Sequence, residues 1–171
     1  MIQKFSITFI MLFSINALAQ KDIFAISRNG TVAELKELME KNPNSINEQN
    51  ENGFTPLILA CYRGNNDVAK FLIKEVKDID ALSEMGTALM ACSVKGNVEI
   101  AKLLLEKGCN PNLTDSSGTT ALILATQFKN IKMIEALLKH NADKSKIDNK
   151  GKTAFEYAAF SGNEEIINLL K

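Results

Sequence analysis

Cysteine is the residue type in this chain with the clearest potential for chemistry. The stretch ACSVKGNVEIAKLLLEKGCNPN, residues 91–112, contains Cys92 and Cys109, and Cys61 brings the count to three. An odd count leaves at least one thiol without a partner inside the chain, and an accessible thiolate can carry redox chemistry or link to another chain. The stretch is therefore either a thiol site or a structural unit in which cysteine serves as a small side chain.

The other residue types that usually perform catalysis are scarce. His140 is the only histidine, and no acidic residue or cysteine lies at metal-ligand spacing from it. The carboxylate pairs, at residues 164–165 and at Asp78 and Asp80, have no neighbour that would raise a pKa, so we expect them to be solvated. The sequence predicts no catalytic residue, no metal ligand and no cofactor, and hence no enzyme. With 20 basic and 20 acidic residues, the net charge implies no nucleic-acid partner.

Residues 1–19 differ in composition from the rest of the chain. One lysine precedes an apolar run over residues 5–15, and the segment ends in Ala17-Leu18-Ala19, a small-x-small pattern that signal peptidase accepts. A bilayer span needs ~20 apolar residues, so this run is too short to cross a membrane. We therefore expect a secretory signal peptide at residues 1–19, no membrane insertion after its cleavage, and a periplasmic or secreted protein. The alternative is an uncleaved N-terminal anchor.

The remainder of the chain repeats one segment. Its four clearest copies recur every 32 or 33 residues and begin at Thr55, Thr87, Thr120 and Thr153. An earlier segment, residues 22–40, fits the same frame, with Gly30 in the place that glycine takes in three later copies. A repeat of this length is typical of solenoids, in which each unit buries its apolar face only against its neighbours.

Each copy has the residue pattern of two helices joined by a turn. The opening threonine is a good N-cap, and Pro56 suits the first helical position because its missing N–H costs nothing there. Small residues follow on the first helix and allow neighbouring helices to approach closely. A Gly-Asn pair makes the turn, and the second helix, such as residues 98–105, has apolar residues at helical spacing. The first helices are expected to face inward through Leu57, Leu89, Leu122 and Phe155.

The pattern D-x-x-G-x-T-P/A-L-x-x-A, followed by G-N-x-x-I and L-L-x-x-G, resembles the ankyrin repeat over nearly all of residues 20–171. The resemblance implies an all-α ankyrin-repeat solenoid of about five helix-turn-helix units, with β-hairpin-like fingers projecting from one side. The units are expected at about residues 21–49, 50–82, 83–114, 115–147 and 148–171. The resemblance also implies a protein-binding scaffold.

Two departures from the pattern predict local distortions. The third unit is one residue short between Gly86 and Thr87, so we expect a tightened or distorted finger there. The fourth unit has Lys129 where glycine should turn the chain. Either this lysine adopts a left-handed backbone at a cost of ~1 kcal/mol, or the turn relaxes to another geometry. The first and last units, which lack parts of the pattern, are expected to act as caps.

The repeat frame assigns the cysteines to packing positions. Cys92 lies at the small position of the first helix, Cys61 lies one residue after it, and Cys109 takes the place that Ala142 has in the next unit. Equivalent atoms of stacked elements lie ~10 Å apart, whereas a disulfide needs Cα atoms within ~7 Å. We therefore expect packing thiols and no bridge between Cys61 and Cys92. The alternative is a redox or intermolecular role.

The candidate binding residues are those that the repeat itself does not need. In this architecture the finger tips and the exposed ends of the first helices line a concave face. Bulky apolar residues recur along it, and clustered aromatic residues are typical of interfaces. The alternative is that some of them cover the seams between units. The predicted protein-binding residues are Phe54, Tyr62, Arg63, Met85, Val94, Lys95, Gln127, Phe128, Lys152 and Phe160.

The leading functional hypothesis is an exported, non-enzymatic, monomeric scaffold that binds another protein through this face. The second hypothesis is a periplasmic immunity or inhibitor-type protein that neutralises or regulates an exported enzyme or toxin. The third is a thiol-linked or redox-active protein built on Cys109. Repeat architecture alone does not name the partner, because function depends on the variable surface residues.

Overall fold

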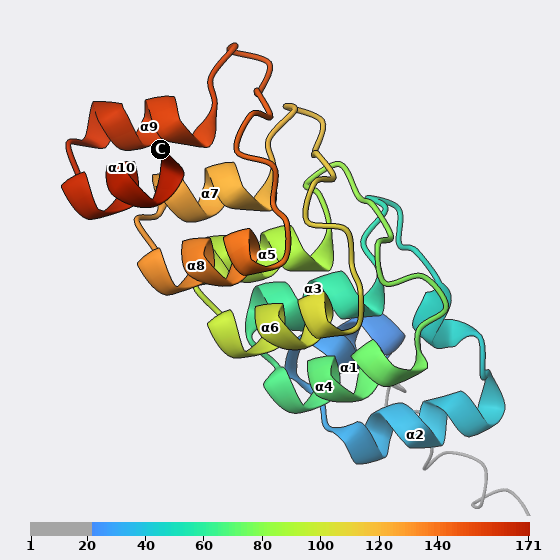
Figure 1. Ribbon diagram of the computed structural model, residues 1–171. Helices are drawn as coiled ribbons and strands as arrows, with labels where there is room; N and C mark the ends of the chain where they lie inside the picture. The colour runs from blue at the N-terminus through green and yellow to red at the C-terminus, as the bar shows by residue number, and fades with distance from the viewer. Residues whose placement is uncertain (1–21) are drawn as a thin grey trace, which may run out of the picture.

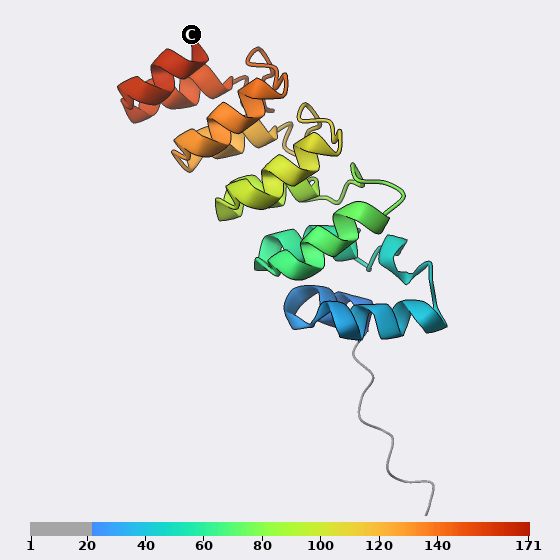
Figure 2. The same cartoon turned by 60° about the horizontal axis from the view of Figure 1, so that its bottom comes forward.

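A computed structural model describes residues 22–171; the predicted signal peptide lies outside the described residues. Within that range the chain forms helix pairs that stack in chain order from the first unit to the last (Figures 1 and 2). The elements are α1 (Ile23–Asn29), α2 (Val32–Lys41), the 3-10 helix η1 (Ser45–Asn47), α3 (Pro56–Arg63), α4 (Asn66–Glu75), α5 (Ala88–Lys95), α6 (Val98–Glu106), α7 (Ala121–Gln127), α8 (Ile131–Lys139), α9 (Ala154–Ser161) and α10 (Glu164–Leu170).

The helices form two layers. The first helices of the pairs, α1, α3, α5, α7 and α9, pack on one another in an inner layer, and the second helices pack likewise in an outer layer. The loops that lead into the inner helices project from one edge of the stack (Figure 1). The apolar core fills the space between the layers and runs without a break from Ile23 to Leu170. This arrangement confirms the predicted all-α solenoid of five helix pairs.

Threonine caps fix where the inner helices begin. The Thr55 hydroxyl accepts a hydrogen bond from the Ile58 N–H at 3.2 Å, and the Thr120 hydroxyl accepts one from the Ile123 N–H at 3.2 Å. Thr87 and Thr153 make the same contact. Each bond satisfies one of the backbone donors that a helix start leaves free. Because threonine caps recur at α3, α5, α7 and α9, these inner helices start in the same register along the stack.

The small position on the inner helices lies at the centre of the core. Ala60, Cys92, Ala125 and Ala158 occupy it in successive units, and all four are fully buried. Small side chains at this position let the inner helices pack directly on one another. The position thus accepts cysteine as readily as alanine.

The turns between paired helices depend on a left-handed residue. Gly64 and Gly96 have φ of 73° and 70°, and Lys129 has φ of 55° at the equivalent place. The following N–H then donates to a carbonyl of the inner helix: Asn97 to Cys92 and Asn130 to Ala125, each at 2.9 Å. The left-handed conformation of Lys129 preserves this hydrogen bond, and this explains why a lysine adopts it here.

Gly30 is an exception to the predicted frame. Its backbone is extended, with φ of −93°, whereas the other turn glycines are left-handed. A Cβ atom at this position would lie 2.8 Å from the backbone of Ile26, so glycine is required here for close approach.

The fingers are tight turns held by their first residue. Asp115 accepts hydrogen bonds from the N–H groups of Ser117 and Thr119 at 2.8 and 2.9 Å through one carboxylate oxygen. Asn50 and Asp148 hold the second and fifth fingers in the same way. Pairing of the hairpin type within residues 22–171 is limited to two isolated bridges, one of which joins Thr114 to Thr120.

The third finger is shorter than the others, as the missing residue predicted. It closes over residues 83–86, where the Ser83 N–H donates to the Gly86 carbonyl at 3.1 Å and the Gly86 N–H donates back at 3.0 Å. The Ser83 hydroxyl also donates to the Gly86 carbonyl. The third finger is thus a shorter turn held by a serine, whereas Asn or Asp holds the longer turns of the other fingers described above.

The prediction that Phe155 faces inward is wrong. The equivalent Leu57, Leu89 and Leu122 are at most 2% exposed, whereas Phe155 is 36% exposed. Those leucines lie on α3, α5 and α7, each of which packs between two other inner helices, whereas α9 packs against α7 alone among the described inner helices. The loss of one neighbour therefore exposes a residue that the repeat otherwise buries.

Relief of the left-handed lysine is expected to stabilise the protein. Lys129→Gly should raise the free energy of unfolding by about 1 kcal/mol, or the melting temperature by about 2–4 °C, because glycine adopts positive φ without steric cost. As a matched control, Lys102→Gly within α6 should lower it by about 1 kcal/mol, since glycine weakens a helix interior. Thermal unfolding measures both; equal destabilisation by the two changes would contradict a strained Lys129.

Candidate protein-binding face

We define the finger–helix face as the finger tips together with the exposed C-terminal ends of the inner helices. Tyr62 and Arg63 end α3 on this face, and Lys95 ends α5 in the next unit. The Lys95 ammonium lies over the Tyr62 ring, 5.2 Å from its centroid. A cation over an aromatic ring is attracted by the ring's negative face, so this contact holds neighbouring helix ends in a fixed arrangement.

Three of the predicted apolar residues are strongly exposed on the face. Phe160 is 90% exposed, Met85 at the short third finger is 62% exposed, and Phe128 is 56% exposed. Single exposed apolar residues are common on protein surfaces, but here they recur in the third, fourth and fifth units, and Tyr62 adds one in the second. Repetition along one face is the property expected of an interface.

The predicted residues are not equivalent in the structure. Gln127 and Lys152 are exposed, like Arg63 and Lys95. Phe54, in contrast, is half-buried and packs against the core, and Val94 is also half-buried. Phe128 lies one position later than Tyr62 in the repeat frame, when each is counted from its capping threonine, and it caps the C-terminus of α7. The face therefore has its exposed apolar residues at both ends of the inner helices rather than in a strict one-per-turn row.

A polar cluster supports the C-terminal end of the face. The Asp148 carboxylate accepts hydrogen bonds from the Lys150 and Lys152 N–H groups at 2.9 and 3.0 Å, and from the Tyr157 hydroxyl at 2.5 Å. The Lys152 ammonium lies 5.6 Å from the centroids of both the Tyr157 and the Phe160 rings. This network joins the fifth finger to α9.

The hydrogen bond between Asp148 and Tyr157 shifts the pKa of both groups. Donation by the Tyr157 hydroxyl lowers the pKa of the Asp148 carboxyl below its ordinary value, and the finger N–H groups lower it further. The same bond raises the pKa of Tyr157. At neutral pH the pair is therefore a charged acceptor with a neutral donor, which is the stronger kind of hydrogen bond.

Sequence reasoning missed three residues near this face. Ile147 and Leu82 are exposed although the repeat alignment gave them no role, and Tyr157 supports the fifth finger. One sequence signal could have indicated the special character of the last unit. Glu156 replaces the buried apolar residue that the other inner helices have three positions after the capping threonine, such as Ile123.

The three cysteines are packing residues in the structure. Cys61, Cys92 and Cys109 are free thiols and all are buried. Burial raises the pKa of Cys109 to about 12, and contact with Cys61 together with burial raises the pKa of Cys92. The thiolate is the reactive form of cysteine, so the raised pKa values of Cys92 and Cys109 disfavour reaction at neutral pH, and Cys61 is fully buried.

The described residues contain no group of three His, Cys, Asp or Glu side chains placed to bind a metal ion. Across residues 22–171, no helix is both long and apolar enough to cross a membrane. Both statements concern this part of the chain alone.

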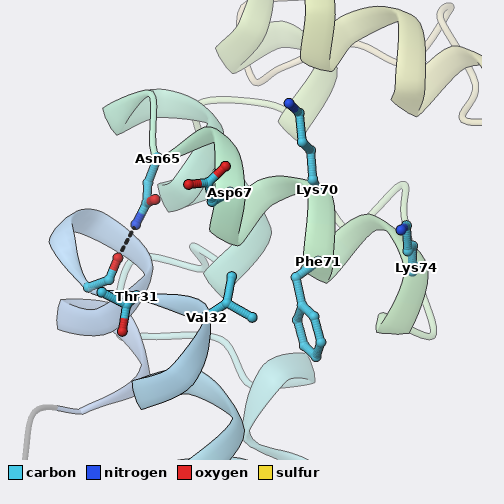
Figure 3. Close-up of a pocket in the computed structure, with 8 residues that line it drawn as sticks. Thr31, Val32, Asn65, Asp67, Lys70, Phe71 and Lys74 are labelled. Carbon is cyan, nitrogen blue, oxygen red and sulfur yellow. Dashed lines mark hydrogen bonds between the residues drawn. The ribbon is translucent and has the colours of Figure 1, made fainter.

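Hollows in the surface lie along the outer helices. One of about 500 Å³ opens between α2 and α4, and Figure 3 shows Phe71 and Val32 on its apolar side and Asp67 near its rim. The Asn65 side chain closes one end by donating to the Gly30 carbonyl at 2.9 Å. Hollows of similar size, about 530 and 570 Å³, follow between α4 and α6 and between α6 and α8. Their recurrence at successive seams indicates that they result from helix stacking.

The bond between Asp148 and Tyr157 is expected to contribute stability that depends on pH. Tyr157→Phe should lower the free energy of unfolding by about 1 kcal/mol at pH 7, because the carboxylate loses a donor. The contribution of a carboxyl whose pKa is lowered is present above its unfolded value of about 3.9 and is lost as pH falls through the folded value. The difference in the free energy of unfolding between Tyr157→Phe and the unchanged protein should therefore shrink near pH 3. Tyr62→Phe, which removes a hydroxyl without a hydrogen-bond partner, should have no effect at either pH; a Tyr157→Phe effect that does not change with pH would contradict this account.

Known proteins resemble the chain over most of its length. The sequence profile of the family described as ankyrin repeats, in three copies, matches residues 23–115 and 107–171. Inversin of Canis lupus familiaris is 31% identical over 164 residues, which are 94% of this chain and 15% of that protein. Ankyrin repeat and SAM domain-containing protein 6 of Mus musculus is 35% identical over 105 residues, 60% of this chain and 12% of that protein.

A protein of Treponema pallidum (strain Nichols), whose name refers to ankyrin repeats, is 34% identical over 119 residues, 68% of this chain and 40% of that protein. The chain thus spans between 12% and 40% of the length of these relatives. The ankyrin repeat is typically a non-enzymatic module for protein–protein interaction. On the profile match, the stacked helix pairs and the threonine-capped repeats, the chain belongs to the ankyrin-repeat family.

Proposed function

We propose that this protein is an exported, non-enzymatic binding protein that acts as a monomer and captures another protein on its finger–helix face. The observation that carries the proposal is the recurrence of exposed apolar side chains on that face, at Tyr62, Met85, Phe128 and Phe160. Residues that the scaffold does not need for its own packing are free to serve recognition.

The chemistry of these side chains supports an interface. Aromatic residues and methionine supply large contact areas, and aromatic residues with arginine are the commonest energetic anchors of protein complexes. Arg63 lies beside Tyr62 at the end of α3, and Lys95 stacks on the Tyr62 ring. The exposed face thus combines apolar anchors with one cation, Lys95, that already lies against an anchor, which reduces the entropy lost on binding.

The arrangement of the titratable groups supports a non-enzymatic role. In the described chain the acidic groups with lowered pKa values, such as Asp143 and Asp148, accept hydrogen bonds from their own loops. The pKa values of the buried Cys92 and Cys109 thiols are raised, and His140 contacts the Ala136 carbonyl of its own helix. These groups serve local structure, and a nucleophile next to a base is the minimum that covalent catalysis requires.

Capture of the partner tests the proposal. The whole chain is used as bait in extracts of the periplasm and the culture medium of the source cells, and bound proteins are identified by mass spectrometry. The double variant Tyr62→Ser/Phe128→Ser should retain at most about one tenth of the partner, since loss of interface anchors costs 2 kcal/mol or more.

The control is the double variant Lys102→Ser/Lys132→Ser, with both changes at exposed positions of the outer helices. It should bind as the unchanged chain does. All three proteins should melt within about 2 °C of one another, because exposed side chains contribute little to stability. Undiminished capture by the face variant, or a large fall in its melting temperature, would refute the assignment of these residues to binding.

Export is tested by the N-terminus of the protein recovered from the source cells. Cleavage after Ala19 gives a chain that starts at Gln20, found in the periplasm or the medium. A membrane-bound chain that still starts at Met1 would instead support the anchor hypothesis. The captured partner's activity, measured with and without this protein, then separates an inhibitor or immunity protein from a scaffold.

A further inference from the structure

The C-terminal end of the finger–helix face places two exposed lysines beside an exposed aromatic ring. We define the C-terminal corner as Lys150, Lys152, Tyr157 and Phe160. Both lysines are exposed, and Phe160 is the most exposed of the large apolar residues described. Lys146, also exposed, lies on the segment that leads into this finger. The corner therefore combines positive charge with an exposed aromatic ring.

The acidic groups near the corner do not neutralise these lysines by direct pairing. The Asp148 carboxylate accepts from its own finger and from Tyr157. The Glu156 carboxylate accepts from the backbone N–H and the hydroxyl of Thr153, as part of the capping box at the start of α9. Asp143 accepts from Ser145. Each carboxylate is thus engaged in holding a turn or a helix start.

The lysine ammonium groups have no carboxylate in ion-pair contact, although at longer range Lys150 lowers the pKa of Asp148 and Lys152 lowers the pKa of Glu156. The ion pairs found among residues 22–171 are Lys41 with Glu37 and Lys70 with Glu99, so Lys150 and Lys152 have no carboxylate oxygen within 4 Å. The Lys152 ammonium instead lies over the Tyr157 and Phe160 rings. A cation held over aromatic rings keeps its outward N–H donors free for an incoming anion.

We infer that the corner binds a segment of the partner protein in which carboxylate side chains stand next to an apolar or aromatic residue. This inference rests on the proposed function and adds the chemistry of the partner to it. Lys150 and Lys152 would receive the carboxylates, and the Phe160 ring would receive the apolar side chain. Opposite charge at the edge of an interface speeds association and selects the partner.

The neighbouring fingers favour a protein segment over a nucleic acid. Glu51 and Glu84 are exposed on the second and third fingers, so the positive charge of the corner does not continue along the finger row. A phosphate backbone needs a continuous basic track, and it would be repelled by these carboxylates. A short acidic segment needs only the corner.

Fluorescence anisotropy with defined peptides tests the inference. The probes are a labelled peptide of four Asp-Glu-Phe repeats and its neutral Asn-Gln-Phe and basic Lys-Lys-Phe counterparts, each added to the whole chain. The acidic peptide should bind about tenfold more tightly than either counterpart, and its affinity should fall as salt is raised, because exposed charges are screened. Equal affinity for the three peptides would overturn the inference.

Matched variants locate the site. Lys150→Gln/Lys152→Gln should weaken the acidic peptide about tenfold, whereas Lys102→Gln/Lys132→Gln, with the same change in net charge on the outer helices, should leave its affinity unchanged. Phe160→Ser should weaken the acidic peptide without altering the salt dependence of the remaining binding. If the two double variants weaken binding of the acidic peptide equally, its affinity depends only on the net charge of the protein, and the corner is not a binding site.

Two further arms keep the other occupants distinguishable. An oligouridine or a phosphatidylserine vesicle that binds more tightly than the acidic peptide, and is lost with Lys150→Gln/Lys152→Gln, would overturn a protein occupant. If the acidic peptide shows no preference but Tyr62→Ser/Phe128→Ser still abolishes partner capture, the charge inference fails and the proposed function stands. If the peptide binds at the corner but that variant captures normally, the proposed function fails alone.

Discussion

The close approach of neighbouring inner helices is the constraint on which this structure depends. A fully buried alanine or cysteine at the small position of four successive inner helices lets each helix lie directly on the next. A larger side chain there would separate two units, and because a unit packs only on its neighbours, every finger beyond that point would move with it. The constraint explains why Cys92 is interchangeable with Ala125. It also sets the spacing between helix ends, and so the spacing at which Tyr62 meets Lys95.

The features that the sequence predicts well are those whose cause is local. A threonine cap needs only the N–H three residues later, and a left-handed turn needs only the hydrogen bond that follows it, so both could be located from the repeat, including the difficult Lys129. Exposure is different, because it depends on whether a neighbour is present. Phe155 has the same place in the repeat as Leu122, but it lies on α9, which among the described inner helices packs against α7 alone. Phe54 is half-buried because it packs against the core, a contact that its place in the repeat does not indicate.

The fingers separate the residues that hold the fold from those that can recognise a partner. Asp115 and Asp148 both accept hydrogen bonds from their own finger, so both carboxylates serve to hold a turn. Asp148 accepts one more hydrogen bond, from Tyr157. In the fourth unit the place of Tyr157 is taken by Leu124, whose side chain has no hydrogen-bond donor. The last unit thus has a more polar inner helix and a more firmly held finger than its neighbours. Recognition is left to the residues between these anchors, such as Lys150 and Lys152.

The units that carry the finger–helix face differ in how many neighbouring units they pack against. Tyr62 and Lys95 belong to units with a neighbour on each side, so their geometry is set by packing above and below. The corner around Phe160 belongs to a unit that, among the described helices, packs against one other pair, and units with fewer contacts open at lower free energy. A ligand that binds only the closed form of that unit stabilises it by mass action. Because Asn149 donates to the Ser117 carbonyl of the preceding finger at 2.9 Å, stabilisation of the fifth finger extends to the fourth. A partner segment bound at the proposed corner would therefore stabilise the fourth and fifth fingers together.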